Sequence, residues 1–177
     1  MPRHPRSAMT RNNGDPSASE VIRELREKAR PEKARVLSSF FKTGKGQYGE
    51  GDVFLGVSVP EQRKIAQRFR ELPLREVSTL LMSNVHEHRL TGLLVLVERS
   101  RAGSAEEQAA IADFYLAHSE RVNNWDLVDL SANHILGAHL LKRPRKMLYR
   151  LARSRLLWER RIAIIATFAF ILSLIHI

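Results

Sequence analysis

Apolar residues recur along most of the chain at spacings of three and four, which is the period of an amphipathic α-helix. Ile65, Phe69 and Leu72 show it clearly, and they follow a Ser58-x-x-Glu61 capping box that predicts a helix start. Further stripes of this kind lie at 21–25, 36–41, 74–81, 90–97, 111–115, 127–141, 147–151 and from 158 onward. No segment alternates with a period of two for long enough to predict a strand.

These stripes predict eight or nine helices joined by short turns that contain Pro, Gly or Ser. Paired antiparallel helices of this length favour an all-α fold, a superhelical α-solenoid of HEAT-like helix pairs. Because no strict sequence repeat is present, a divergent solenoid and an irregular bundle both stay open. We expect residues 18–170 to form this domain and residues 1–17 to be a disordered basic tail, with Met1 or Met9 as the start.

A glycine-rich segment interrupts the helical pattern, with five glycines between Gly44 and Gly56. It contains a literal G-x-G-x-x-G, but a helical stripe precedes it and no helix follows at once, so a dinucleotide site is disfavoured. We interpret the segment as a flexible loop whose Lys42, Lys45 and Tyr48 are available to a phosphate backbone.

The last sixteen residues, Ile162–Ile177, carry no acid, Lys or Arg. A membrane-spanning helix needs about 20 apolar residues, so a buried core helix is the better interpretation. We expect no membrane partner.

Basic residues exceed acidic ones, 29 against 19, which gives a net charge of +10 and favours a polyanionic partner. Nine Lys or Arg and one acid lie between Lys142 and Arg161. A solvated helix face usually mixes both signs, so we expect Arg143, Arg145, Lys146 and Arg160 to contact phosphates.

Metal and thiol chemistry are disfavoured. Cysteine is absent, which excludes disulfides and a thiolate zinc site. None of the seven histidines has the spacing of a zinc-binding helix, so we interpret them as solvated or core-edge residues and expect neither a metal nor another cofactor.

The segment Trp125-Asp126-Leu127-Val128-Asp129 is the strongest candidate for chemistry. Trp125 and Asp129 are four residues apart and share a face of a helix. Asp126 is placed to cap this helix or to accept hydrogen bonds from its first turn. In isolation the segment also fits a core tryptophan beside an N-terminal acid.

Three blocks change that balance: Val53–Arg63, Trp125–Asp129 and Trp158–Ala163. In this order they resemble the AlkD-type DNA alkylation-repair glycosylases, and the resemblance runs from about Arg30 to Phe170. It implies a superhelix of HEAT-like helix pairs. It also implies hydrolysis of the N-glycosidic bond of cationic alkylated purines, such as 7-methylguanine and 3-methyladenine, in double-stranded DNA.

Residue by residue, Asp129 matches the family's catalytic carboxylate, and Trp125 matches the aromatic residue that lies against the damaged nucleotide. Arg161 matches the arginine near the lesion and its phosphate. A monomer that acts in the bacterial cytoplasm, associated with the nucleoid, is the expectation that follows.

The resemblance stops at Phe170, so we expect a C-terminally truncated reading frame with a non-native tail at 171–177. Two alternatives to a glycosylase stay open. One is a non-catalytic HEAT-like module that binds distorted or branched DNA, and the other is a protein-interaction solenoid.

Overall fold

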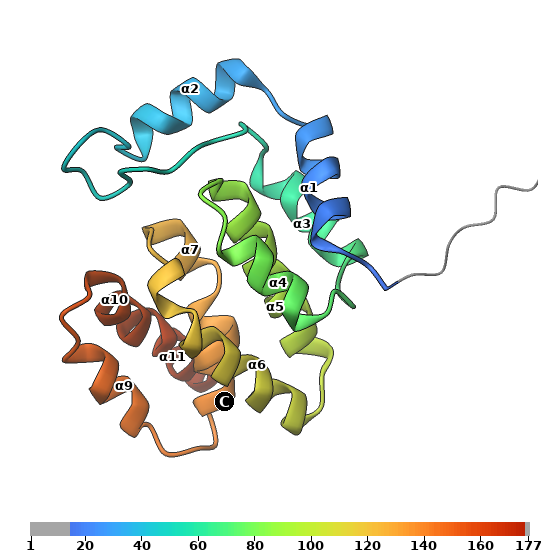
Figure 1. Cartoon of the computed structure of the whole chain (residues 1–177). Helices are drawn as coiled ribbons and strands as arrows, with labels where there is room; N and C mark the ends of the chain where they lie inside the picture. The colour runs from blue at the N-terminus through green and yellow to red at the C-terminus, as the bar shows by residue number, and fades with distance from the viewer. Residues whose placement is uncertain (1–14, 176–177) are drawn as a thin grey trace, which may run out of the picture.

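The computed structural model describes residues 15–175, which form helices joined by turns (Figure 1). The first half holds α1 (Ala18–Glu27), α2 (Pro31–Phe40), α3 (Val59–Arg68), α4 (Leu74–Leu81), α5 (His86–Ala102) and α6 (Ala105–Ala117). The second half holds the 3₁₀ turn η1 (Ser119–Arg121), α7 (Trp125–Asp129), the π-helical turn η2 (Asn133–Gly137), α8 (Ala138–Leu140), α9 (Lys146–Ala152), α10 (Leu157–Ala166) and α11 (Phe168–Ile175). The predicted all-α class is confirmed.

Neighbouring helices pack as pairs, and the pairs follow one another from α1 and α3 to α9 and α10 (Figure 1). The central helix is α5, which packs against α3, α4 and α6. Its residues from His86 to Val97 are all buried. A helix that is buried on every side lies inside the molecule, and α5 accordingly lies between α3, α4 and α6.

Two helix starts follow directly from their sequences. Ser58 caps α3 and Glu61 bonds back to it, which confirms the predicted capping box. Ser17 and Glu20 form the same motif at the start of α1. Ser17 is therefore part of the folded chain, whereas residues 1–14 of the expected disordered tail lie outside the described residues.

The helical stripe predicted at 127–141 is one continuous pattern in sequence but not one helix. It is divided into α7, η2 and α8. Ser131 donates a hydrogen bond to the carbonyl oxygen of Leu127 and also contacts the Tyr115 hydroxyl, and such back-bonding bends helices. At Gly137 a Cβ atom would lie 2.3 Å from the carbonyl oxygen of Ala166, so α10 crosses here against bare backbone. The break itself lies at Leu130 and Ser131, and the chain is helical again from Ala132 through Gly137 to Leu140.

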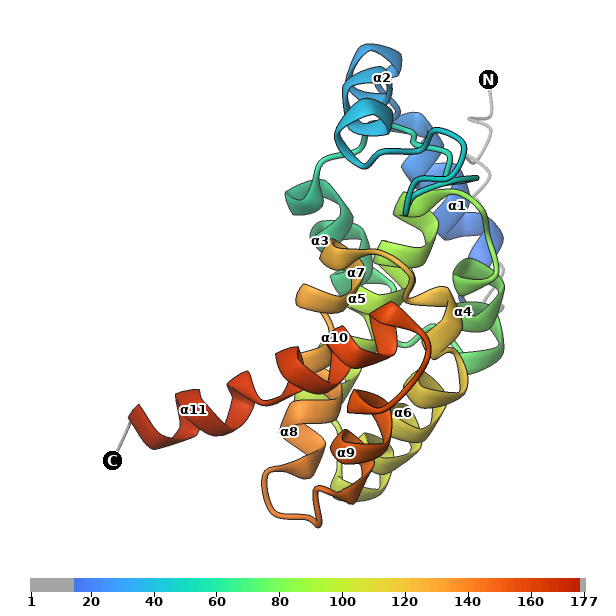
Figure 2. The same ribbon diagram turned by 90° about the vertical axis from the view of Figure 1, so that its left-hand side faces the viewer.

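The apolar C-terminal segment forms two helices, and the expectation of one buried core helix holds only for the first. In α10, Ile162, Ala163, Ile165 and Ala166 are buried. Helix α11 projects from the body (Figure 2) and leaves Ile171, Leu172 and Leu174 at least half exposed. Among the described residues, no helix has both the length and the apolar character that crossing a membrane requires. The proposed tail boundary at residue 171 stays a prediction.

Candidate functional site

Helix α7 presents Trp125 and Asp129 from a single short turn. Asn124 caps it by accepting a hydrogen bond from the backbone N–H of Trp125. Both predicted site residues are partly exposed, while Leu127 and Val128 between them are fully buried in the core. The buried residues anchor the helix and leave Trp125 and Asp129 accessible.

Asp129 and Arg161 form a two-pronged ion pair between α7 and α10. The Nε and Nη2 atoms of Arg161 donate to the two carboxylate oxygens of Asp129 at 2.8 and 2.7 Å. This contact raises the pKa of the Arg161 guanidinium. Both side chains are about one-third exposed, Asp129 at 33% and Arg161 at 39%, so a ligand has access to the pair.

An aromatic stack supports Trp125 from one side. The ring of Phe41 is stacked on Trp125 at 5.3 Å between centroids and on Phe54 at 5.1 Å. Phe40 meets Trp125 edge to face at 6.0 Å. Offset-stacked and edge-to-face contacts between aromatic rings are favourable, so the orientation of the indole is set by residues that precede the glycine-rich segment.

The glycine-rich segment folds back on Phe41, which explains one of its glycines. The backbone N–H of Gly49 bonds to the carbonyl oxygen of Lys42. A Cβ atom at position 49 would lie 2.4 Å from the carbonyl oxygen of Phe41, a distance that no side chain tolerates. The segment therefore needs glycine here to hold Phe41 beneath Trp125, and it forms no phosphate-binding helix start, as the sequence indicated.

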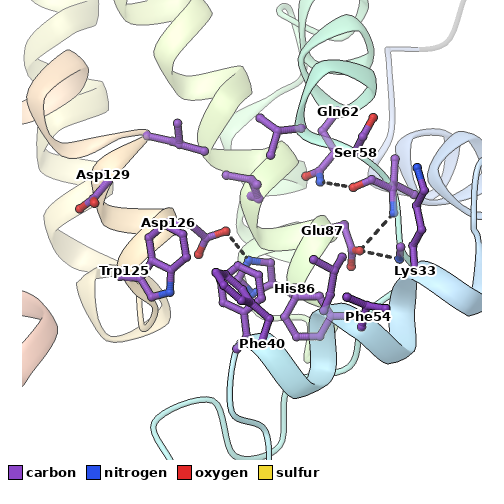
Figure 3. A pocket seen from close by; sticks show the side chains of 18 of the residues that line it. Lys33, Phe40, Phe54, Ser58, Gln62, His86, Glu87, Trp125, Asp126 and Asp129 are labelled. Atoms are coloured by element: carbon purple, nitrogen blue, oxygen red, sulfur yellow. Dashed lines mark hydrogen bonds and ion pairs between the residues drawn. The ribbon is translucent and has the colours of Figure 1, made fainter.

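A groove of about 730 Å³ opens between α2 and the body of the molecule (Figure 3). Helix α2 and the residues between Phe41 and Val59 supply most of the groove's apolar lining, and Trp125, Asp126 and Asp129 lie together at one end. Helix α2 has no fully buried residue. Arg30, just before it, is tied to Glu61 of α3 by two hydrogen bonds.

Trp125 also borders a second cavity, of about 640 Å³. Tyr48, Trp158, Arg160 and Arg161 line it, and the Tyr48 and Trp158 rings meet edge to face at 5.9 Å. Trp125 thus stands between an apolar groove that holds Asp129 and an aromatic and cationic cavity that holds Arg161. Aromatic faces beside guanidinium groups are the usual surroundings of nucleic-acid bases and phosphates.

The residues predicted to contact phosphate, six of them basic together with Tyr48, fall into two groups. Tyr48 and Arg160 lie together beside Trp125, and Lys42 and Lys45 are exposed on the segment that carries Tyr48. The second group is exposed around the start of α9, with Arg143 and Arg145 on the preceding turn and Lys146 as the first residue of the helix. Figure 2 shows this turn at the far end of α9 from the start of α10, and Arg145 lies over the Phe170 ring at 4.0 Å.

A buried charged cluster beneath α7 was not predicted. His86 places its Nε2 atom 2.8 Å from Asp126 and its Nδ1 atom 3.2 Å from Asp52. Arg89 donates to the other oxygen of Asp52 at 2.7 Å. The interpretation of the histidines as solvated or core-edge residues is wrong for His88, which is 4% exposed, and for His86, which is 2% exposed. Its two aspartates lie 34 and 40 positions away in sequence, too far for a local pattern to reveal.

Glu87 is a second residue that the sequence did not single out. Its buried carboxylate accepts hydrogen bonds from the backbone N–H groups of Leu55, Gly56 and Val57. It thereby fixes the end of the glycine-rich segment against α5 (Figure 3). The available sequence signal was the polar run 86–89 at the start of an otherwise apolar helical stripe.

With this geometry in place, comparison with known proteins identifies the family. Residues 21–173 match the family described as DNA alkylation repair enzyme. The chain belongs to this family. No curated protein matches the sequence.

A solved structure described as a predicted DNA alkylation repair enzyme from Enterococcus faecalis is similar to the chain, with a TM-score of 0.55 and 19% sequence identity. The similarity covers 77% of this chain and 63% of that chain. At this identity the likeness shows a shared fold. The three blocks that resembled DNA alkylation-repair proteins all lie within the family match, which ends three residues beyond Phe170.

Proposed function

We propose that this DNA alkylation repair family member is a DNA glycosylase that hydrolyses the N-glycosidic bond of cationic alkylated purines, 7-methylguanine and 3-methyladenine, in duplex DNA. The observation that carries the proposal is the Asp129–Arg161 ion pair beside the accessible ring of Trp125. It supplies an oriented carboxylate, a cation and an aromatic face at one place on a strongly basic protein.

The chemistry suits a cationic base. An alkylated purine that already carries a positive charge leaves as a neutral molecule, so no strong general acid is needed to break the bond between C1′ and nitrogen. The sugar develops oxocarbenium character at C1′, and the Asp129 carboxylate stabilises that charge electrostatically. Water adds to C1′ and passes its proton to Asp129 and then to solvent, which leaves an abasic site.

Arg161 and Trp125 have supporting roles in this scheme. The Nε and Nη2 atoms of Arg161 hold Asp129, and in this scheme its third nitrogen, Nη1, pairs with the phosphate of the lesion. The indole face of Trp125 attracts the cationic sugar or base edge by about 1 kcal/mol at a partly exposed site. The cavity on the far side of Trp125, with Tyr48 and Arg160, receives the neighbouring backbone.

The experiment is to incubate this chain with N-methylated duplex DNA, measure released 7-methylguanine and 3-methyladenine, and titrate DNA binding against salt. Release of either base supports the proposal. Salt-sensitive binding without release contradicts it and favours a non-catalytic module that binds distorted or branched DNA. Absence of DNA binding at low salt contradicts both and favours a protein-interaction solenoid.

A further inference from the structure

The start of α5 carries a buried group that the proposed reaction does not use. His86 lies between the carboxylates of Asp52 and Asp126, and the side chains of all three residues are less than one-tenth exposed. Arg89, one turn further along α5, is 1% exposed and completes the cluster through Asp52. Buried charges are costly unless they are paired and hydrogen-bonded, so this cluster needs an account.

With Asp52 and Asp126 both ionised, the geometry requires both ring nitrogens of His86 to carry protons. A neutral imidazole has one N–H donor, and its other nitrogen presents a lone pair. Here each nitrogen faces a carboxylate oxygen, so only an imidazolium donates to both. Charge balance agrees, because two aspartates, Arg89 and a protonated His86 sum to zero. Burial opposes protonation of His86, but the hydrogen bonds to Asp126 and Asp52 outweigh it and raise the pKa.

The cluster joins the two segments that build the candidate site. Asp52 lies in the glycine-rich segment, and its neighbour Val53 bonds to the backbone on both sides of Val85 at the start of α5. Asp126 belongs to α7, between Trp125 and Asp129. Helix α7 has only five residues. Its position therefore depends on contacts from outside, chiefly the packing against α10, the Phe41 stack and the bond from His86.

We propose that His86 is a positioning residue, held as an imidazolium, whose two N–H groups tie the glycine-rich segment to α7 and keep Trp125 and Asp129 in their working arrangement. The effect on catalysis rests on the proposed glycosylase function. The protonated His86 that bridges Asp52 and Asp126, called the bridge below, can be tested without DNA.

The charged groups around His86 come from every element packed against it. Asp52 faces it from the glycine-rich segment, Asp126 from α7 and Arg89 from α5 itself. Arg121 of η1 lies further out and acts on Arg89 and Asp52. The remaining cover is aromatic, with Phe54 stacked on the imidazole at 4.6 Å and Phe41 at 5.1 Å. The carboxylates dominate, so the bridge is complete below the ordinary histidine pKa and is lost as the pH rises through the raised one.

The first test uses the unmodified protein without DNA. Nitrogen-15 NMR of the histidine side chains reports how many ring nitrogens carry a proton. We expect His86, assigned by its absence in His86→Gln, to show two protonated nitrogens at neutral pH and to titrate above the ordinary histidine pKa. A neutral ring at neutral pH, or titration at or below the ordinary histidine pKa, would overturn the proposal.

A second test asks whether the bridge controls Trp125. Trp158→Phe leaves Trp125 as the sole tryptophan, because the chain has two. We expect its fluorescence to change with pH in step with the His86 titration. The change should vanish in His86→Gln and persist in His134→Gln, a matched control on η2. A transition that survives in His86→Gln would contradict the coupling. If His86→Gln does not fold, Trp158→Phe alone is measured. Trp125 emission that does not follow the His86 titration seen by NMR then overturns the coupling.

The third test separates this inference from the proposed function. In base excision, we expect His86→Gln to lower kcat about 10- to 100-fold and to leave DNA affinity unchanged. In the parent, kcat should fall as the pH rises through the His86 pKa, and this fall should be absent in His86→Gln. Unchanged kcat and an unchanged pH profile would overturn the positioning role while the glycosylase stands. If the parent excises nothing, the proposed function fails, and the NMR and fluorescence results still decide the bridge.

Discussion

Arg161 of α10 holds both carboxylate oxygens of Asp129 of α7, at 2.8 and 2.7 Å. The pair joins helices that are 32 positions apart in sequence and fixes the carboxylate beside Trp125. A planar guanidinium determines the direction of both oxygens, which a single-point cation does not. The contact is therefore better explained as orientation of a reactive group than as a source of stability, because partly exposed ion pairs contribute about 1 kcal/mol or less.

The first prediction concerns this geometry. Arg161→Lys keeps the charge but loses the two-pronged contact, so we expect base excision to slow by about 10- to 100-fold with little change in the free energy of unfolding. Single-turnover excision and urea denaturation measure the two quantities. Arg99→Lys is the matched control, because Arg99 of α5 also pairs with a carboxylate, that of Glu107 of α6 at 2.8 Å, away from the candidate site. Equal effects of the two variants would contradict the assigned role.

The second prediction concerns the aromatic support of Trp125. Phe41 is 6% exposed and sits between Phe54 and Trp125, whereas its neighbour Phe40 is 60% exposed. We expect Phe41→Ala to lower the free energy of unfolding by about 3 kcal/mol or more and to alter Trp125 fluorescence. Phe40→Ala should cost about 0.5 kcal/mol. Urea denaturation compares them, and similar losses for both would show that the stack is not the support described.

The third prediction concerns the glycine-rich segment. A methyl group at Gly49 meets the backbone of Phe41, while one at Gly44 meets only the flexible end of Gln47. We therefore expect Gly49→Ala to shift the segment and destabilise the protein by about 1 to 3 kcal/mol, and Gly44→Ala to do so much less. Thermal unfolding of the two variants is the measurement. A Gly49→Ala protein as stable as the parent would contradict the close approach.

The fourth prediction concerns acid stability. Burial lowers the pKa of His88 to about 4 from an ordinary value of 6.5, with nearby Arg26 and Arg89 adding to the effect. The unfolded chain then binds more protons than the folded one between these values. The contribution of His88 to the free energy of unfolding is therefore fully present above pH 6.5 and is lost as the pH drops toward 4. We expect His88→Gln to flatten that slope in urea denaturation and the control His118→Gln to retain it; an unchanged slope in His88→Gln would oppose the assignment.

The fifth prediction concerns Lys42 and Lys45, which we propose contact the phosphate backbone near Trp125. Replacing Lys42 and Lys45 with Gln should lower the slope of log affinity against log salt by about two, because each cation that pairs with a phosphate contributes about one. Excision by the saturated complex should be unchanged. Arg70→Gln with Arg75→Gln, on exposed positions around α4, is the charge-matched control and should leave the slope intact. A slope that responds equally to both pairs would indicate diffuse electrostatics.

The sequence supported the helical elements well because their information is local. The stripe at 65–72 and the capping box at Ser58 needed only neighbouring residues, and both are present. The stripe at 127–141 does not form one regular helix. Ser131 bonds to Tyr115 and Gly137 packs against α10, and both partners are distant in sequence. Local periodicity carries no record of such contacts.

The site follows the same rule. Trp125 and Asp129 were found together because they share one helical turn. The resemblance implied Arg161 as well, and its bond to Asp129 across a helix interface comes from the structure alone. The cluster of Asp52, His86 and Asp126 was missed because its members come from three separate segments. Polar residues inside an apolar helical stripe, as at 86–89, are the sequence feature that indicates such a cluster.

The most direct test of the central claim compares Asp129→Asn with the parent in single-turnover excision of 7-methylguanine, with DNA affinity measured in parallel. Asparagine keeps the shape of the side chain and removes its charge, and Asp113→Asn on the exposed face of α6 is the matched control. We expect a rate loss of about 100-fold or more in Asp129→Asn, with DNA affinity and the control close to the parent. Excision that proceeds undiminished in Asp129→Asn would contradict this claim.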